Sequence, residues 1–207
     1  MTSTNRFASL VSLALHPAVI PTLGLYLILE LDLYLKYSIS EAYKTTLCTV
    51  VFVNTLVFPV VLVWLLRVRN MISDLTLSNR NERHTPYAFT AFLYLFTWYL
   101  FKRFGVSPLI LSLIFGSMLS AAILFVLNFK WKISAHMTGI SGLLGAVVAI
   151  NLKFQVPMTS LIILFGLIWG LVGYSRITLG AHRPYQVYGG AILGFFTVGL
   201  AVWMGWG

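Results

Sequence analysis

The chain is hydrophobic, basic and poor in charged residues. Of its 207 residues, 59% are hydrophobic and 9% are charged, and the formal net charge is +9. A soluble domain usually carries about 25% charged residues, so the composition excludes a soluble domain and indicates one integral membrane domain over residues 1–207. The single cysteine, Cys48, excludes a disulfide within the chain and a cysteine-based metal cluster.

Apolar runs divide the chain into seven candidate transmembrane helices, and the expected fold is an all-α, polytopic helical bundle. A run of about 17 to 25 apolar residues is needed to span a hydrocarbon core of about 30 Å. The third and fifth runs are short, so six spans remain an alternative to seven. In chain order the candidate spans cover residues 10–29, 47–66, 86–101, 108–127, 137–152, 157–174 and 187–206.

Basic and histidine-bearing connectors are expected on one face of the bilayer. With seven spans, the connectors after the second, fourth and sixth spans lie on the same side as the N-terminus. That side holds nine of the fourteen Lys and Arg residues, which favours the cytoplasm. Four of the nine are candidate site residues, and without them five cations remain on each side, so charge leaves the orientation open. The basic and histidine residues of these connectors are Arg67, Arg69, Arg80, Arg83, His84, Lys130, Lys132, His136, Arg176, His182 and Arg183.

The net positive charge restricts the kinds of partner. The cations are scattered through short connectors instead of forming one basic face, which argues against nucleic acid as a partner. Anionic lipid headgroups or a phosphate-bearing substrate remain as the expected partners. Glycines recur within the last three candidate spans, and this spacing predicts close helix packing: Gly139, Gly142, Gly145, Gly166, Gly170, Gly173, Gly190 and Gly194.

Two histidines stand where candidate spans begin. His182 precedes the last span, and Gln186 follows it at a four-residue offset, where an amide oxygen could orient the imidazole. His136 lies at the start of the fifth span, where free backbone N–H groups favour an anion. Each histidine could instead cap its helix, and Ser134 could equally be a plain N-cap.

Two arginines precede the third candidate span. Arg80 and Arg83 are three residues apart, so on a helical turn both guanidinium groups could face one phosphate. The alternative is a basic connector that contacts lipid headgroups.

Together these segments resemble the type 2 phosphatidic acid phosphatase superfamily, membrane relatives of the vanadium-dependent haloperoxidases. Ser175, Arg176 and His182 match the family's S-R-x5-H-x3-D motif, with Gln186 in the place of the aspartate. Ser134 and His136 match the family's P-S-G-H motif at two positions. The K-x6-R-P motif fits poorly, with Arg83 as its arginine, no lysine at residue 76 and the proline only at residue 86. The resemblance covers residues 80–194.

The resemblance implies a lipid phosphatase that needs neither metal nor other cofactor. By motif position, His182 would be the nucleophile and His136 the general acid, while Arg83, Ser134 and Arg176, with Arg80 beside them, would bind the substrate phosphate. Gln186 would orient His182, although it lacks the charge of an aspartate, and Asp74 or Glu82 could supply a carboxylate instead. The expected substrate is a membrane lipid phosphomonoester or pyrophosphate, of the polyprenyl or glycerolipid kind.

Two other functions remain open. The chain could be a catalytically silent relative that binds phospholipid or a membrane partner, or a phosphotransferase that passes a phosphoryl group to a lipid alcohol. The resemblance favours the cytoplasmic membrane of a bacterium, with the site on its outer face, whereas the cation count leans inward. The sequence does not define an oligomeric state.

Overall fold

The protein is described from a computed structural model, in which residues 3–31 and 34–207 are defined. These residues form helices and contain no strand. The α-helices are α1 (Ser3–Ala14), α2 (Ile20–Glu30), α3 (Tyr34–Ser38), α4 (Glu41–Phe52), α5 (Phe58–Val68), α6 (His84–Arg103), α7 (Pro108–Asn128), α8 (Ala135–Phe154), α9 (Thr159–Thr178) and α10 (Pro184–Met204). A π-helical turn, η1 (Val53–Val57), joins α4 to α5, and a 3-10 turn, η2 (Arg80–Arg83), precedes α6.

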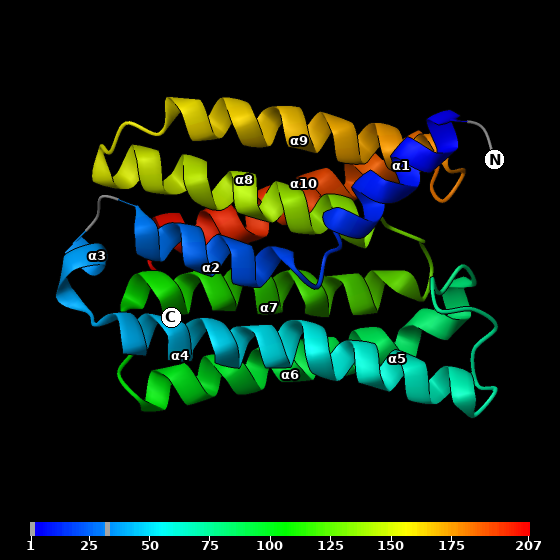
Figure 1. Ribbon diagram of the computed structural model, residues 1–207, viewed down its shortest axis with the longest axis horizontal. Coiled ribbons are helices and arrows are strands. Elements are labelled where there is room, and N and C mark those ends of the chain that lie inside the picture. Colours follow the sequence, from blue (N-terminus) through cyan, green and yellow to red (C-terminus); the bar gives the residue numbers. More distant parts are fainter. Residues whose placement is uncertain (1–2, 32–33) are drawn as a thin grey trace.

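The helices lie lengthwise beside one another, as Figure 1 shows. The start of α1 and the connectors that lead into α6, α8 and α10 lie at one end of the bundle. The opposite end holds α3, the connectors that lead into α7 and α9, and the C-terminus. The basic and histidine-bearing connectors therefore share one end of the bundle, as the order of the apolar runs predicts.

Five helical segments are long and apolar enough to cross a membrane. They are Glu41–Val68, which combines α4, η1 and α5, together with α7, α8, α9 and α10. The all-α fold and the integral membrane character predicted from composition are thereby supported. Helix α6 has 20 residues but is not among the five, and α2 is apolar but shorter. The five segments are fewer than the six or seven spans predicted from the sequence.

The first predicted span, residues 10–29, is not one continuous helix. Helix α1 ends at Ala14, and α2 begins at Ile20 after a turn in which Val19 N–H donates to the His16 carbonyl. Pro17 has no amide hydrogen, and its ring clashes with a preceding helical turn, so a helix cannot pass through it unbroken. The wide turn η1 is tied to this break, because the Thr55 hydroxyl donates to the Ala18 carbonyl at 3.1 Å.

Glycines let α8 and α10 pack in direct backbone contact. A Cβ atom on Gly194 would lie 2.0 Å from the Thr138 carbonyl oxygen, and one on Gly145 would lie 2.4 Å from that of Phe195. Close packing is the role predicted for the small residues, and here it fixes the first turn of α8 against α10. Gly166 and Gly170 on α9 differ, since a Cβ atom there would meet nothing within 4 Å.

Candidate functional site

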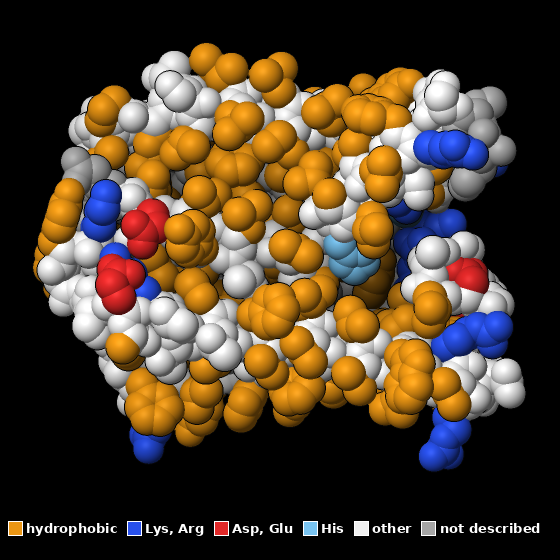
Figure 2. Space-filling view, in the orientation of Figure 1, with side chains coloured by type: hydrophobic (Ala, Val, Ile, Leu, Met, Phe, Trp, Pro, Cys, Tyr) orange, Lys and Arg blue, Asp and Glu red, His pale blue; other side chains and the backbone are white. Residues whose placement is uncertain are grey.

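A cavity of about 670 Å³ opens at the end of the bundle that holds the basic connectors. Its polar wall is formed by Arg83, His136, Arg176 and His182, and by His16 at the break between α1 and α2. Figure 2 shows the hollow, with a histidine side chain at its edge and Lys and Arg side chains behind it. The structure thus brings both predicted histidines and two of the predicted arginines to one cavity.

The connector between α5 and α6 places Arg83 at the cavity, and hydrogen bonds within this connector hold its shape. The Arg83 Nε donates to the Leu77 carbonyl at 2.7 Å, and its side chain is 6% exposed. Asp74 accepts hydrogen bonds from Thr76 and Ser78 of the same connector, so it orders the loop and does not pair with a histidine. With the Nε–H bonded to the protein, Arg83 keeps its terminal nitrogens for the cavity.

Arg176 projects from the last turn of α9 and lacks a counter-ion among the described residues. One terminal nitrogen donates to the Ser12 hydroxyl at 3.2 Å. Its Nε is buried and has no hydrogen-bond partner. A buried donor without a partner usually costs about 1–3 kcal/mol, so an anion in the cavity would relieve this cost.

His182 is held by a backbone carbonyl. The ring is 6% exposed, and its Nδ1 lies 3.3 Å from the Lys132 carbonyl oxygen. Because a carbonyl only accepts, Nδ1 carries the proton and Nε2 keeps a free lone pair. Burial, followed by the positive charges of Arg83, Arg176 and Lys132, lowers the pKa of His182 to about 3. The imidazole is therefore neutral near pH 7.

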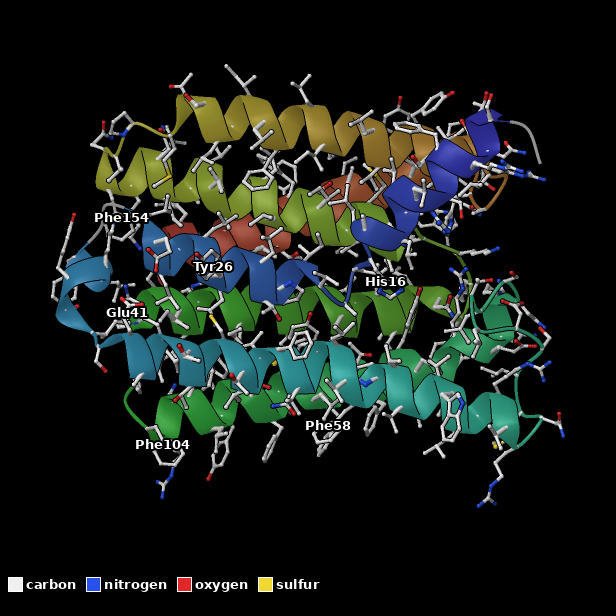
Figure 3. All side chains as sticks on the ribbon, in the orientation of Figure 1. His16, Tyr26, Glu41, Phe58, Phe104 and Phe154 are labelled. Carbon is white, nitrogen blue, oxygen red and sulfur yellow. The ribbon has the colours of Figure 1, made fainter. Side chains whose placement is uncertain are left out.

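His136 is anchored to α1 from the first turn of α8. Its Nε2 lies 3.1 Å from the Ser12 carbonyl oxygen, which makes Nε2 the protonated nitrogen and leaves Nδ1 free. The His16 ring packs edge-on against it, with a centroid distance of 5.3 Å and an interplanar angle of 82°. Figure 3 places His16 at the link between α1 and α2, toward the end of the bundle that holds the basic connectors.

Three predicted site residues serve the framework instead of the cavity. The Gln186 amide oxygen accepts from Arg183 N–H at 3.0 Å and caps α10, so the prediction that it orients His182 is wrong, and the Lys132 carbonyl takes that place. Arg80 is half-buried and donates to the Lys130 carbonyl at 2.9 Å. Ser134 is buried and caps α8, because its hydroxyl accepts a hydrogen bond from Met137 N–H. An N-cap was the alternative to phosphate binding that the sequence offered for this residue.

Among the residues that the structure describes, no carboxylate stands behind either histidine. Glu82 accepts from the backbone and hydroxyl of Ser73, and Asp74 is bonded within its own loop, so the two proposed substitutes for the motif aspartate are engaged elsewhere. Burial, followed by Arg83 and Arg176, lowers the pKa of Lys132. The polar wall is positively charged because no carboxylate among the described residues pairs with its two arginines, Arg83 and Arg176.

Sequence reasoning missed the contribution of the N-terminal helix. Ser12 touches both Arg176 and His136, and His16 lines the cavity beside His136. The dipeptide of His16 and Pro17 was a usable signal, because proline marks a break and a polar side chain within an apolar run seldom faces lipid. The Lys132 carbonyl carried no such signal, since any residue type supplies one.

Away from its polar end, the cavity continues between apolar walls. Leu113, Leu143 and Val198 line its deeper part. Leu13, Val60 and Trp64 also line it, yet they expose 72%, 51% and 56% of their surfaces, so the cavity reaches the outer face of the helices between α1 and α5. One opening thus combines a cationic end with an apolar flank on the outer face of the helices.

Within the described part of the chain, no three His, Cys, Asp or Glu side chains gather closely enough to hold a metal ion. The cavity wall instead offers guanidinium and imidazole groups, which bind anions. No family model, curated protein or solved structure matches the chain.

Proposed function

We propose that the chain is a membrane-embedded phosphatase that hydrolyses the phosphate ester of a lipid, as the type 2 phosphatidic acid phosphatase superfamily that it resembles does. The observation that carries the proposal is the unpartnered Nε of Arg176, buried in a wall that also holds Arg83 and three histidines. A phosphate monoester would supply the missing counter-charge, while its lipid chain would leave through the apolar flank. Bidentate guanidinium groups suit phosphate oxygens geometrically as well as electrostatically.

In the proposed reaction, His182 Nε2 attacks phosphorus while Arg83 and Arg176 neutralise the phosphoryl oxygens. The bond between phosphorus and the lipid oxygen breaks, and His136 passes to the leaving oxygen a proton that its free Nδ1 first accepts from the phosphate monoanion. A water molecule then attacks the phosphohistidine, His136 takes a proton from that water, and inorganic phosphate leaves with His182 restored. Positioning and charge neutralisation are the main contributions that phosphoryl transfer requires from a protein.

The same proposal gives the chain seven crossings of the bilayer. Helix α6 and the broken pair α1 and α2 would join the five long apolar segments, which are Glu41–Val68, α7, α8, α9 and α10. All the site residues would then lie near one membrane interface, where lipid phosphates reside. The family resemblance favours the outer face of a bacterial cytoplasmic membrane.

Phosphate release from purified protein in detergent tests the proposal. We expect release from dioctanoyl phosphatidic acid or farnesyl phosphate, and its loss in His182→Asn, which keeps a polar side chain of similar reach. His84→Asn is the matched control, since His84 stacks on Phe129 and does not line the cavity. Equal release by wild type and His182→Asn would refute the assignment of the nucleophile.

One observation favours the silent, lipid-binding alternative. His182 is oriented by the neutral Lys132 carbonyl, which stabilises an imidazolium less than a carboxylate does. If the protein binds vanadate or a lipid phosphate without releasing phosphate, this alternative replaces the enzyme.

A further inference from the structure

A line of polar side chains runs down α6 from the cationic end of the cavity. Tyr87, Thr90 and Tyr94 follow Arg83 at helical spacings of four, three and four residues, and all four line the cavity. Offsets of three and four place residues on one helix face. At a rise of about 1.5 Å per residue, Tyr87 and Thr90 lie roughly 6 and 11 Å along the helix axis from Arg83.

The hydroxyl groups of this line have no partner among the described residues. Tyr94 is 6% exposed, yet no hydrogen bond engages its hydroxyl, and the same holds for Tyr87 and Thr90. Thr97 on the same helix shows the ordinary alternative, because its hydroxyl donates to the Leu93 carbonyl at 2.8 Å. All three residues line the cavity, so their hydroxyls are free to hydrogen-bond polar atoms of a ligand there.

The facing helices add acceptors to the same region. Ser117 and Thr138 line the cavity and donate their hydroxyl hydrogens to backbone carbonyls of their own helices. Each hydroxyl oxygen keeps lone pairs that can accept a hydrogen bond from a ligand. The part of the cavity next to the cationic end therefore carries hydrogen-bond donors on α6 and acceptors on α7 and α8. A ligand that is only hydrocarbon in this part would use neither.

We infer that the cavity selects a lipid phosphate whose backbone carries ester, hydroxyl or amine groups next to the phosphate, over a polyprenyl phosphate. This inference rests on the proposed lipid phosphate site and names its substrate class. Glycerolipid and sphingoid backbones both present such groups, whereas a polyprenyl chain is hydrocarbon from its first carbon. A plain hydrocarbon chain would leave the α6 hydroxyls buried without partners, and a site built for hydrogen bonds discriminates strongly against a ligand that lacks them.

The test compares three soluble or short-chain probes: dioctanoyl phosphatidic acid, sphingosine 1-phosphate and farnesyl phosphate. The relative kcat/KM of each is measured for wild type and for Thr90→Val/Tyr94→Phe, which removes two hydroxyls with little change of shape. Tyr99→Phe is the control, because Tyr99 lies on the same helix, is 55% exposed and does not line the cavity. Binding of the same probes is followed in parallel through tryptophan fluorescence, since Trp64 lines the cavity.

We expect wild type to prefer at least one of the two polar-backbone probes over farnesyl phosphate by at least tenfold. The double variant should lower that ratio by about tenfold, because each hydrogen bond contributes about two- to twelvefold and farnesyl phosphate, which makes neither bond, loses less. The two polar-backbone probes distinguish a glycerolipid from a sphingoid source.

Failure of the inference and failure of the proposed function give different results. An equal or better rate on farnesyl phosphate, or an equal loss on all three probes in the double variant, overturns the inference and leaves the phosphatase intact. If no probe releases phosphate, the proposed function fails, and the binding ratios decide the inference. Binding that is selective and loses selectivity in the double variant supports it, whereas unselective binding overturns it.

Discussion

Without a bound anion, Arg176 is predicted to contribute little net free energy to folding. With an anion bound, it is predicted to be essential for binding and turnover. Its guanidinium lies beside the positive wall formed with Arg83, has a buried Nε without a partner, and makes one hydrogen bond, to Ser12. Arg176→Met would lose that bond and leave the Ser12 hydroxyl to find another partner, at a cost of about 1–3 kcal/mol. It would also remove an unpartnered buried donor of similar cost. The two effects oppose each other, so the free energy of unfolding should change by no more than about 2 kcal/mol.

With an anion bound, the same substitution should act very differently. Loss of one charged donor aimed at the transition state typically lowers kcat by about 10²–10³-fold. Vanadate at about 100 times its Kd should stabilise wild type by about 2.7 kcal/mol and the variant far less. Arg103→Met is the matched control, since Arg103 is exposed at the opposite end of the bundle.

Thermal unfolding in detergent, with and without vanadate, and phosphate release provide the two measurements. The reasoning predicts a variant with nearly unchanged Tm, no vanadate shift and little activity. A strongly lowered Tm for Arg176→Met, or a vanadate shift equal to that of wild type, would show that Arg176 supports the fold and not an anion.

Further substitutions test separate parts of the account. The pKa of His182 is about 3 in the folded chain against about 6.5 unfolded, so the unfolded state binds the extra proton between these values. Stability should be lost as pH falls from about 6.5 toward 3, by at most about 1.4 kcal/mol per pH unit, and equilibrium unfolding of His182→Asn should show a shallower slope. Gln186→Leu should lower stability by about 1 kcal/mol through the lost cap, with relative kcat changed less than threefold. In melting experiments Gly194→Val should prevent or severely weaken folding, because its Cβ would meet the Thr138 carbonyl, whereas Gly170→Ala should leave the Tm within a few degrees.

The sequence predicted the helical class and the convergence of the connectors because both follow from apolar runs. Hydrocarbon thickness sets the length of each run, and alternation of direction then decides which connectors share an end. The break at Pro17 lay within the predicted first span, although proline is a recognised helix breaker. Helix α6 was predicted as residues 86–101 and extends to Arg103.

The site was predictable where side-chain chemistry carries the information. His136, Arg176, His182 and Arg83 were found from residue type and spacing, and they line one cavity. The Lys132 carbonyl could not be found in this way, since backbone groups leave no mark in the sequence. Gln186 illustrates the reverse error, because a spacing of four residues fits an orienting role and a capped helix equally well.

Trapping the covalent intermediate is the most direct test of the proposed chemistry. Purified protein is mixed with radiolabelled lipid phosphate, quenched in base within one turnover, and digested for mass spectrometry, because phosphohistidine survives base and is lost in acid. The account predicts an acid-labile phosphoryl group on His182, absent from His182→Asn and unaffected in the His84→Asn control. Phosphate release without label on His182, or label on another residue, would contradict it.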